Sequence, residues 1–123
     1  MPHLNLTVSA FNQRLYDQAA RQAAEGLATS QGRDEAFWMG LLETCEGFSL
    51  LQQKQMLKAE RKLVAAMEKL RNFGFRYNNF EVTASLAGTR RCVEEIRITR
   101  QMKSKIFDVS LLPQMRLAAK ADD

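Results

Sequence analysis

The chain has 123 residues, of which 46% are hydrophobic and 26% are charged, and this fits a single domain with a packed apolar core. Two prolines and six glycines argue against a sheet-rich fold with many tight turns, and no apolar run approaches the roughly 18 residues of a membrane span. A formal net charge of +4 permits an anionic partner but does not require one.

The N-terminal segment carries apolar residues three and four positions apart, a spacing that favours helices. It predicts a first helix over residues 3–12, with Asn12 suited to the turn that follows. A second helix is predicted over residues 16–29, where Tyr16 and several alanines share one face. These small side chains allow a neighbouring helix to approach closely.

The third predicted helix, over residues 34–53, has the widest apolar stripe in the chain. A turn at Gly32 precedes it, and Asp34 is the expected N-cap. Trp38 follows the predicted core residue Phe37, and a helix turns by about 100° per residue. We therefore expect Trp38 to point away from the core and to lie on the surface.

The second half of the chain alternates one more helix, a loop and a fifth helix. A helix over residues 55–72 has an apolar face opposite a charged face. The aromatic-rich segment 72–80 is the clearest predicted loop, and Asn79 is a candidate cap for a fifth helix over residues 80–102. On this fifth helix, Arg90, Arg97 and Arg100 can line one basic side.

The last segment, residues 103–123, differs in character from the helices. It is apolar and broken by Pro113, so it packs either as an extended arm or as a last short helix, and we expect residues 118–123 to fray. The predicted architecture is an all-α, five-helix bundle of helical hairpins over residues 1–102 with a C-terminal arm over residues 103–123.

Four segments together resemble a known family in their order and spacing: AFNQRLYDQAARQAAEGLA, FWMGLLETCEGF, KAERKLVAAMEKL and NNFEVTASL. The family is the small all-helical domain-of-unknown-function family numbered 309, which occurs in bacteria, archaea and plastids. The resemblance spans residues 4–97 and is carried by positions that build the scaffold. It implies the fold and not a reaction, because no activity is established for the family.

The chain departs from this family at its polar signature, Glu-Ala-His-Glu followed by a further Glu and a Trp. Gln18 stands in place of the first Glu, Ala20 of the His, Arg21 of the next Glu, Ala24 of the third Glu and Leu27 of the Trp. Histidine and carboxylates could exchange protons or bind a metal, and their replacements cannot. The resemblance therefore implies a degenerate member that has lost any signature site.

Residues that commonly carry catalysis are few and stand in no recognised motif. His3 is the single histidine and lies near the start of the chain, while Cys45 and Cys92 lie inside apolar helical patterns. We interpret the cysteines as buried thiols in a reducing compartment, with a disulfide between them as the alternative. The sequence thus predicts no catalytic residue, no metal site, no cofactor and no enzyme activity.

Two further expectations concern residual chemistry and location. A polar pocket shared by Arg21, Glu25 and Glu43 would revive an enzymatic interpretation based on the family. The N-terminal segment lacks the cationic stretch and apolar run of a signal peptide, so we expect the protein in the cytoplasm or, given the family, in the plastid stroma.

The favoured function is a protein-interaction adaptor or assembly subunit, with partner contacts from aromatic, arm and basic residues. These candidates are Trp38, Phe75, Arg76, Tyr77, Arg90, Arg97, Arg100, Phe107, Leu111 and Leu112. One alternative is that the arm folds back over Trp38 and covers these surfaces itself. Another is binding of nucleic acid or ribonucleoprotein by the basic fifth helix, and a homo-oligomer also stays open.

Overall fold

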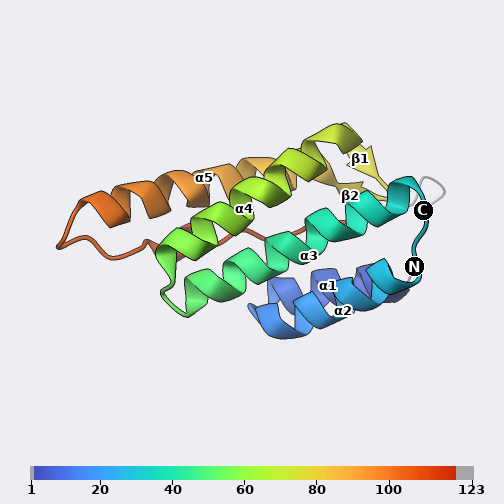
Figure 1. The fold of residues 1–123 in the computed structure, drawn as a ribbon, viewed down its shortest axis with the longest axis horizontal. Coiled ribbons are helices and arrows are strands. Elements are labelled where there is room, and N and C mark those ends of the chain that lie inside the picture. The colour runs from blue at the N-terminus through green and yellow to red at the C-terminus, as the bar shows by residue number, and fades with distance from the viewer. Residues whose placement is uncertain (1, 119–123) are drawn as a thin grey trace.

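A computed structural model describes residues 2–118 and confirms the all-α helical bundle (Figure 1). Its helices are α1 Pro2–Asn12, α2 Tyr16–Ala28, α3 Arg33–Gln52, α4 Met56–Leu70 and α5 Val82–Gln101. Each predicted helix end lies within two residues of the observed one. In this described part of the chain, no helix is long and apolar enough to cross a membrane.

The helices of two helical hairpins, α1–α2 and α3–α4, are joined by the same kind of turn. The two turns lie 40 residues apart in the sequence. In the first turn the Leu15 amide donates to the Ala10 carbonyl at 3.0 Å, and in the second the Gln55 amide donates to the Leu50 carbonyl at 2.9 Å. Such a bond closes the end of a helix over one residue in the left-handed conformation. These residues are Arg14 (φ 63°) and Lys54 (φ 64°), so both turns project a long basic side chain.

Trp38 is buried, with only 2% of its surface exposed, so the expectation of a surface tryptophan was wrong. The cause is the central position of α3, which packs against both α2 and α4. A rotation of about 100° from Phe37 therefore leads to another helix and not to solvent. α2 approaches here at Gly26, where an added Cβ would lie 2.7 Å from atoms of the indole ring.

The segment between α4 and α5 is a small hairpin and not only a loop. After the short 3-10 helix η1 Arg71–Phe73, strand β1 Arg76–Tyr77 pairs antiparallel with β2 Phe80–Glu81. Asn78 and Asn79 form the two-residue turn with φ of 51° and 66°, which suits asparagine in tight hairpins. Asn79 is therefore not the cap of α5, whose N-cap residue is Glu81.

Asp34 also has a different role from the expected one. Gly32 is the N-cap residue of α3, and no side chain caps that helix end. The Asp34 carboxylate instead accepts a hydrogen bond from the Tyr77 hydroxyl, which ties α3 to the hairpin. This bond raises the pKa of Tyr77 because it stabilises the protonated hydroxyl.

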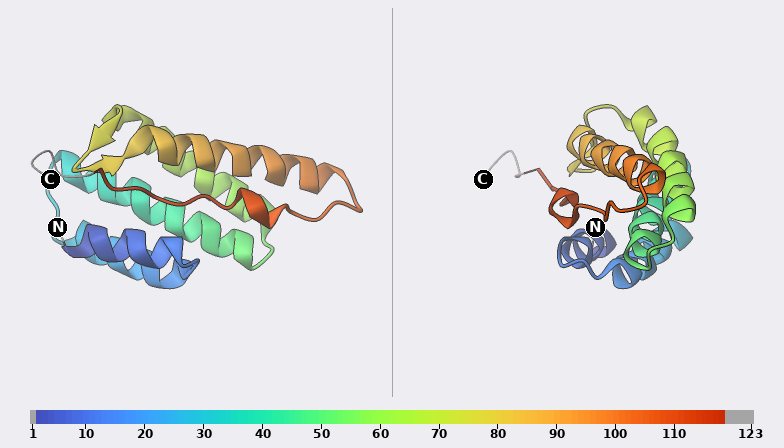
Figure 2. Two further views of the ribbon diagram at one scale, coloured as in Figure 1. Left: turned by 180° about the vertical axis from the view of Figure 1, so that it is seen from behind. Right: turned by 90° about the vertical axis from the view of Figure 1, so that its left-hand side faces the viewer.

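The arm, of which the structure describes residues 103–118, turns back after the end of α5 and runs along the bundle between α5 and α1 (Figure 2). Of the two predicted forms, the structure shows the extended arm, interrupted by the short 3-10 helix η2 Val109–Leu111. At the far end the Glu81 amide donates to the Arg116 carbonyl at 3.0 Å, and Leu117 bridges to Phe80. The fraying expected for residues 118–123 concerns mainly residues 119–123, which lie outside the described part.

The close crossing of α2 and α3 yields a stability prediction. Gly26→Ala places a methyl group where the Trp38 ring lies, so we expect a loss of about 1–3 kcal/mol in the free energy of unfolding. Urea denaturation measures the loss. In a Trp38→Leu background the same change should cost much less, because the ring is gone. An equal cost in both backgrounds would contradict this packing.

Candidate functional site

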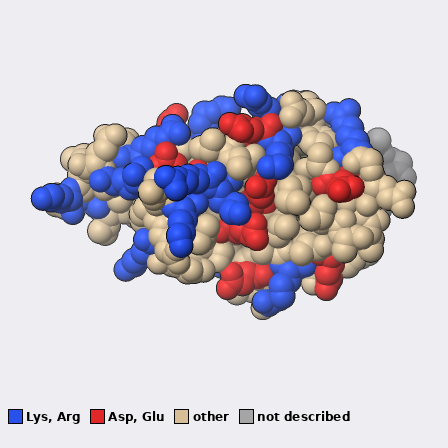
Figure 3. Space-filling view, in the orientation of Figure 1, with Lys and Arg blue, Asp and Glu red and all other residues tan. Residues whose placement is uncertain are grey.

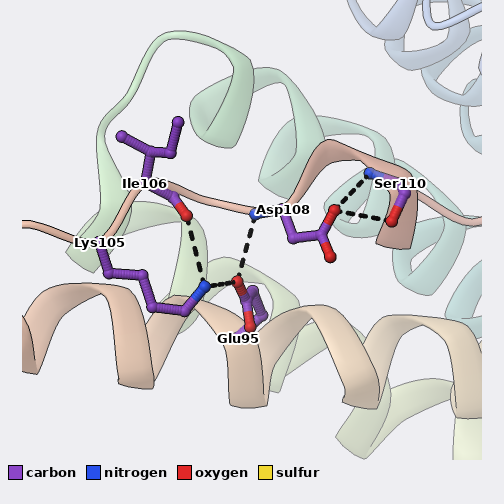
Figure 4. Close-up of polar contacts among 5 residues, drawn as sticks. All are labelled: Glu95, Lys105, Ile106, Asp108 and Ser110. Carbon is purple, nitrogen blue, oxygen red and sulfur yellow. Dashed lines mark hydrogen bonds and ion pairs between the residues drawn. The ribbon is translucent and has the colours of Figure 1, made fainter.

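The arm is fixed to α5 at its start by a buried carboxylate (Figure 4). Glu95 accepts hydrogen bonds from the Lys105 ammonium and, at 3.2 Å, from the Asp108 backbone amide. Asp108 in turn accepts from the Ser110 hydroxyl at 2.7 Å and from the Ser110 amide at 3.0 Å. The Ser110 donors lower the pKa of Asp108, because they favour its charged form.

A second attachment holds the arm against α1 close to its far end. The Asn12 side-chain amide donates to the Met115 carbonyl at 3.0 Å, and its oxygen accepts from the Met115 amide at 2.7 Å. This pair of bonds resembles the pairing of one strand with the next, and Met115 is only 3% exposed. Nearby, Pro113 packs so close to Gly88 that a Cβ there would lie 2.6 Å from the proline Cβ.

These attachments place three predicted partner contacts against the protein's own core. Phe107, Leu111 and Leu112 are half-buried and pack on it. The alternative in which the arm folds back is therefore confirmed for these residues. It is wrong for Trp38, because the hollow beside that ring is lined by residues from α1, α2 and α3 and the turn between them, including Pro2 and Gly26.

The basic residues of α5 are partly neutralised by α4. Arg97 and Arg100 both bind the Glu60 carboxylate, at 3.0 Å and 2.8 Å, and these bonds lower its pKa. Arg90 is exposed and forms no ion pair with any residue in the range 2–118. In Figure 3, lysine and arginine side chains gather at the end of the molecule where α5 runs into the arm.

The candidates in the hairpin lie at the opposite end of α5 from the turn into the arm (Figure 1). Phe75 is 65% exposed and lies beside the Arg76 guanidinium, which also pairs with Glu81 at 2.9 Å. Tyr77 is half-buried, with its ring 4.8 Å from that of Phe37. The predicted contact residues therefore do not form one continuous surface.

The two cysteines are free, buried thiols, so the disulfide alternative was wrong. Burial raises the pKa of the Cys45 thiol far above its ordinary value and that of Cys92 to about 12. Both therefore stay protonated near neutral pH, and the Cys92 thiol donates to the Leu111 carbonyl at 3.2 Å.

The remaining polar candidates are not gathered into a site. Glu25 approaches His3 at 3.5 Å, whereas Glu43 pairs with Lys69 of α4 at 2.6 Å, and Arg21 is exposed. Within residues 2–118, no three side chains of His, Cys, Asp or Glu come together as metal ligands would. Among the described residues, Arg21, Glu25 and Glu43 thus do not form the shared polar pocket that would have favoured an enzymatic interpretation.

Sequence reasoning missed a group of exposed apolar residues on both sides of the turn from α5 into the arm, which we call the arm-end patch and define as Ile98, Met102, Ile106 and Val109. Their side chains are exposed by 44%, 52%, 84% and 60%. The pattern of Ile98 and Met102 alone fits a helix face that packs on a core. Their exposure follows from where the arm turns back, a tertiary feature with no local signal.

No protein-family model, curated protein or solved structure matches the chain. The resemblance to the domain-of-unknown-function family therefore stays a prediction.

The Asn12 attachment yields a test of how the arm is held. Asn12→Ala removes both bonds to Met115, so we expect a loss of about 1–3 kcal/mol in stability and faster tryptic cleavage within the arm. Asn5→Ala changes an exposed asparagine on the same helix and is the matched control. Equal cleavage rates in the two variants would show that Asn12 does not hold the arm.

Glu60 yields a pH dependence. Its pKa is lower in the folded chain than the ordinary 4.5, so its contribution to stability is present above that value and is lost as the pH falls through the folded pKa. Glu60→Gln should cost roughly 0.5–1 kcal/mol at pH 7 and almost nothing at the acid end of the folded range. Glu68→Gln, on the exposed side of α4, should show no such pH-dependent cost.

Proposed function

We propose that the chain is a non-catalytic protein-interaction module whose partner docks on the arm-end patch. The observation that supports the proposal is the position of the exposed apolar side chains in the chain. Residues 2–118 expose eight large hydrophobic side chains, and four of them belong to this patch. Single exposed apolar residues are ordinary, whereas four of them within residues 98–109 favour an interaction surface.

The charges in the same stretch of chain indicate the chemistry of the partner. Arg97, Arg100, Lys103 and Lys105 belong to the same stretch of chain as the four apolar residues. Lys103 is exposed and forms no ion pair among the described residues. Arg97 and Arg100 pair with Glu60, and Lys105 pairs with Glu95. A segment with apolar anchors and flanking carboxylates, such as an acidic amphipathic helix, would complement this surface.

A protein fits this surface better than a nucleic acid does. Bases stack on exposed aromatic rings beside basic side chains. Phe75 is the most exposed aromatic side chain within residues 2–118, and it lies at the other end of α5 from Arg97 and Arg100. Nucleic-acid or ribonucleoprotein binding is therefore the alternative outcome of the experiment below.

The setting we propose is the cytoplasm or the plastid stroma. The two free, buried cysteines fit a compartment in which thiols stay reduced. The absence of activity is part of the same proposal, and the protonated thiols and separated carboxylates support it.

The test is capture of partners from the source lysate by the tagged protein, with and without nuclease, read by mass spectrometry. Ile106→Glu combined with Val109→Glu should reduce capture of the stoichiometric protein partner at least tenfold, because two carboxylates would have to be buried against it. Leu6→Glu, at a side chain 51% exposed on α1, is the matched control and should capture normally.

Three results would contradict the proposal. Equal capture by both variants would remove the arm-end patch from the interface. Loss of the partner after nuclease treatment would favour the nucleic-acid alternative. Recovery of the chain itself alone, with a dimer seen by light scattering, would show that the patch joins two copies.

A further inference from the structure

A cavity of about 510 Å³ lies beneath the arm, a volume within the range of small-molecule sites. Its floor comes from the ends of α2, α3 and α4, and its roof comes from the arm. The walls are mainly apolar and include Phe48, Leu51, Met56, Phe107 and Leu112. Ile106 and Val109 of the arm-end patch also line it.

Two buried hydroxyl groups lack a partner, and both belong to residues that line this cavity. They are the Tyr16 hydroxyl and the Thr99 Oγ1, neither of which has a hydrogen-bond partner in the described part of the chain. The Tyr16 side chain is 1% exposed, and burial raises its pKa to about 12, so the group stays a donor at neutral pH. A buried donor without an acceptor is unfavourable, and a ligand oxygen would satisfy it.

Two basic side chains lie at the edge of the same cavity. Arg14 and Lys54 line it from the two equivalent turns, and both are exposed at their own positions. Neither forms an ion pair with a residue in the range 2–118, whereas Lys105, the third basic residue of the lining, is bound to Glu95. The Arg14 charge lies close enough to the Tyr16 hydroxyl to lower its pKa, in opposition to burial.

We infer that this cavity binds a medium-chain carboxylate. The apolar chain lies among Phe48, Leu51 and Leu112, and the carboxylate accepts the Tyr16 hydroxyl proton in a hydrogen bond beside Arg14 and Lys54. This inference does not rest on the proposed protein interface, because the ligand needs no partner protein, although Ile106 and Val109 belong to both sites.

The experiment is calorimetric titration of the full chain with decanoate below its aggregation concentration, with decanol as the uncharged probe of equal chain length. We expect saturable one-to-one binding of decanoate and at least tenfold weaker binding of decanol. Tyr16→Phe, which keeps the ring, should weaken decanoate binding about fivefold. Arg14→Gln combined with Lys54→Gln should weaken it at least tenfold.

The control replaces two basic residues of α4 that do not line the cavity. Lys58→Gln combined with Arg61→Gln makes the same change in net charge, and it should leave decanoate affinity within twofold of the native chain. Circular dichroism checks that each variant is folded. Absence of saturable binding, equal affinity for decanol, or equal losses in the two double variants would overturn the inference.

Discussion

The position of the arm depends on the Asn12 side chain, which forms the hydrogen bonds that a neighbouring strand would otherwise provide. Asn12, at the end of α1, binds both polar groups of the Met115 backbone, and so gives an extended segment the partner that its peptide groups need when they are buried. Two further attachments hold the arm before this point in the sequence: Pro113 packs on Gly88, and Glu95 binds the Asp108 amide. Without these attachments the arm would not hold Met115 in its buried position, and an apolar gap would remain between α1 and α5.

Both surfaces of functional interest follow from this fold-back. The chain must reverse after α5, and the reversal exposes Ile106 and Val109 while Phe107 and Leu112 turn inward. The same arm closes the roof of the cavity, whose edge carries Arg14 and Lys54 because the helical-hairpin turn is used twice. A partner on the arm-end patch and a small ligand beneath the arm would each favour the folded-back state, because each would bind that state alone.

Sequence reasoning predicted what local periodicity determines. The five helices and the apolar character of the arm follow from spacing and from Pro113. It failed where the answer depends on a distant segment. Trp38 was assigned to the surface because Phe37 already marked the buried face, and nothing local shows that α3 is covered from two sides. Asn12 was read as a turn residue, although its amide binds a segment 103 positions away.

The most direct measurement of this account is amide hydrogen exchange across residues 102–118 in the isolated protein, followed residue by residue by NMR. The account predicts that the Met115 and Asp108 amides, whose acceptors are Asn12 and Glu95, exchange much more slowly than an unfolded chain, while the exposed Ser104 and Ile106 amides exchange quickly. If all the arm amides exchanged at unfolded rates, the arm would not be bound to the bundle. The cavity and the arm-end patch would then not exist as described.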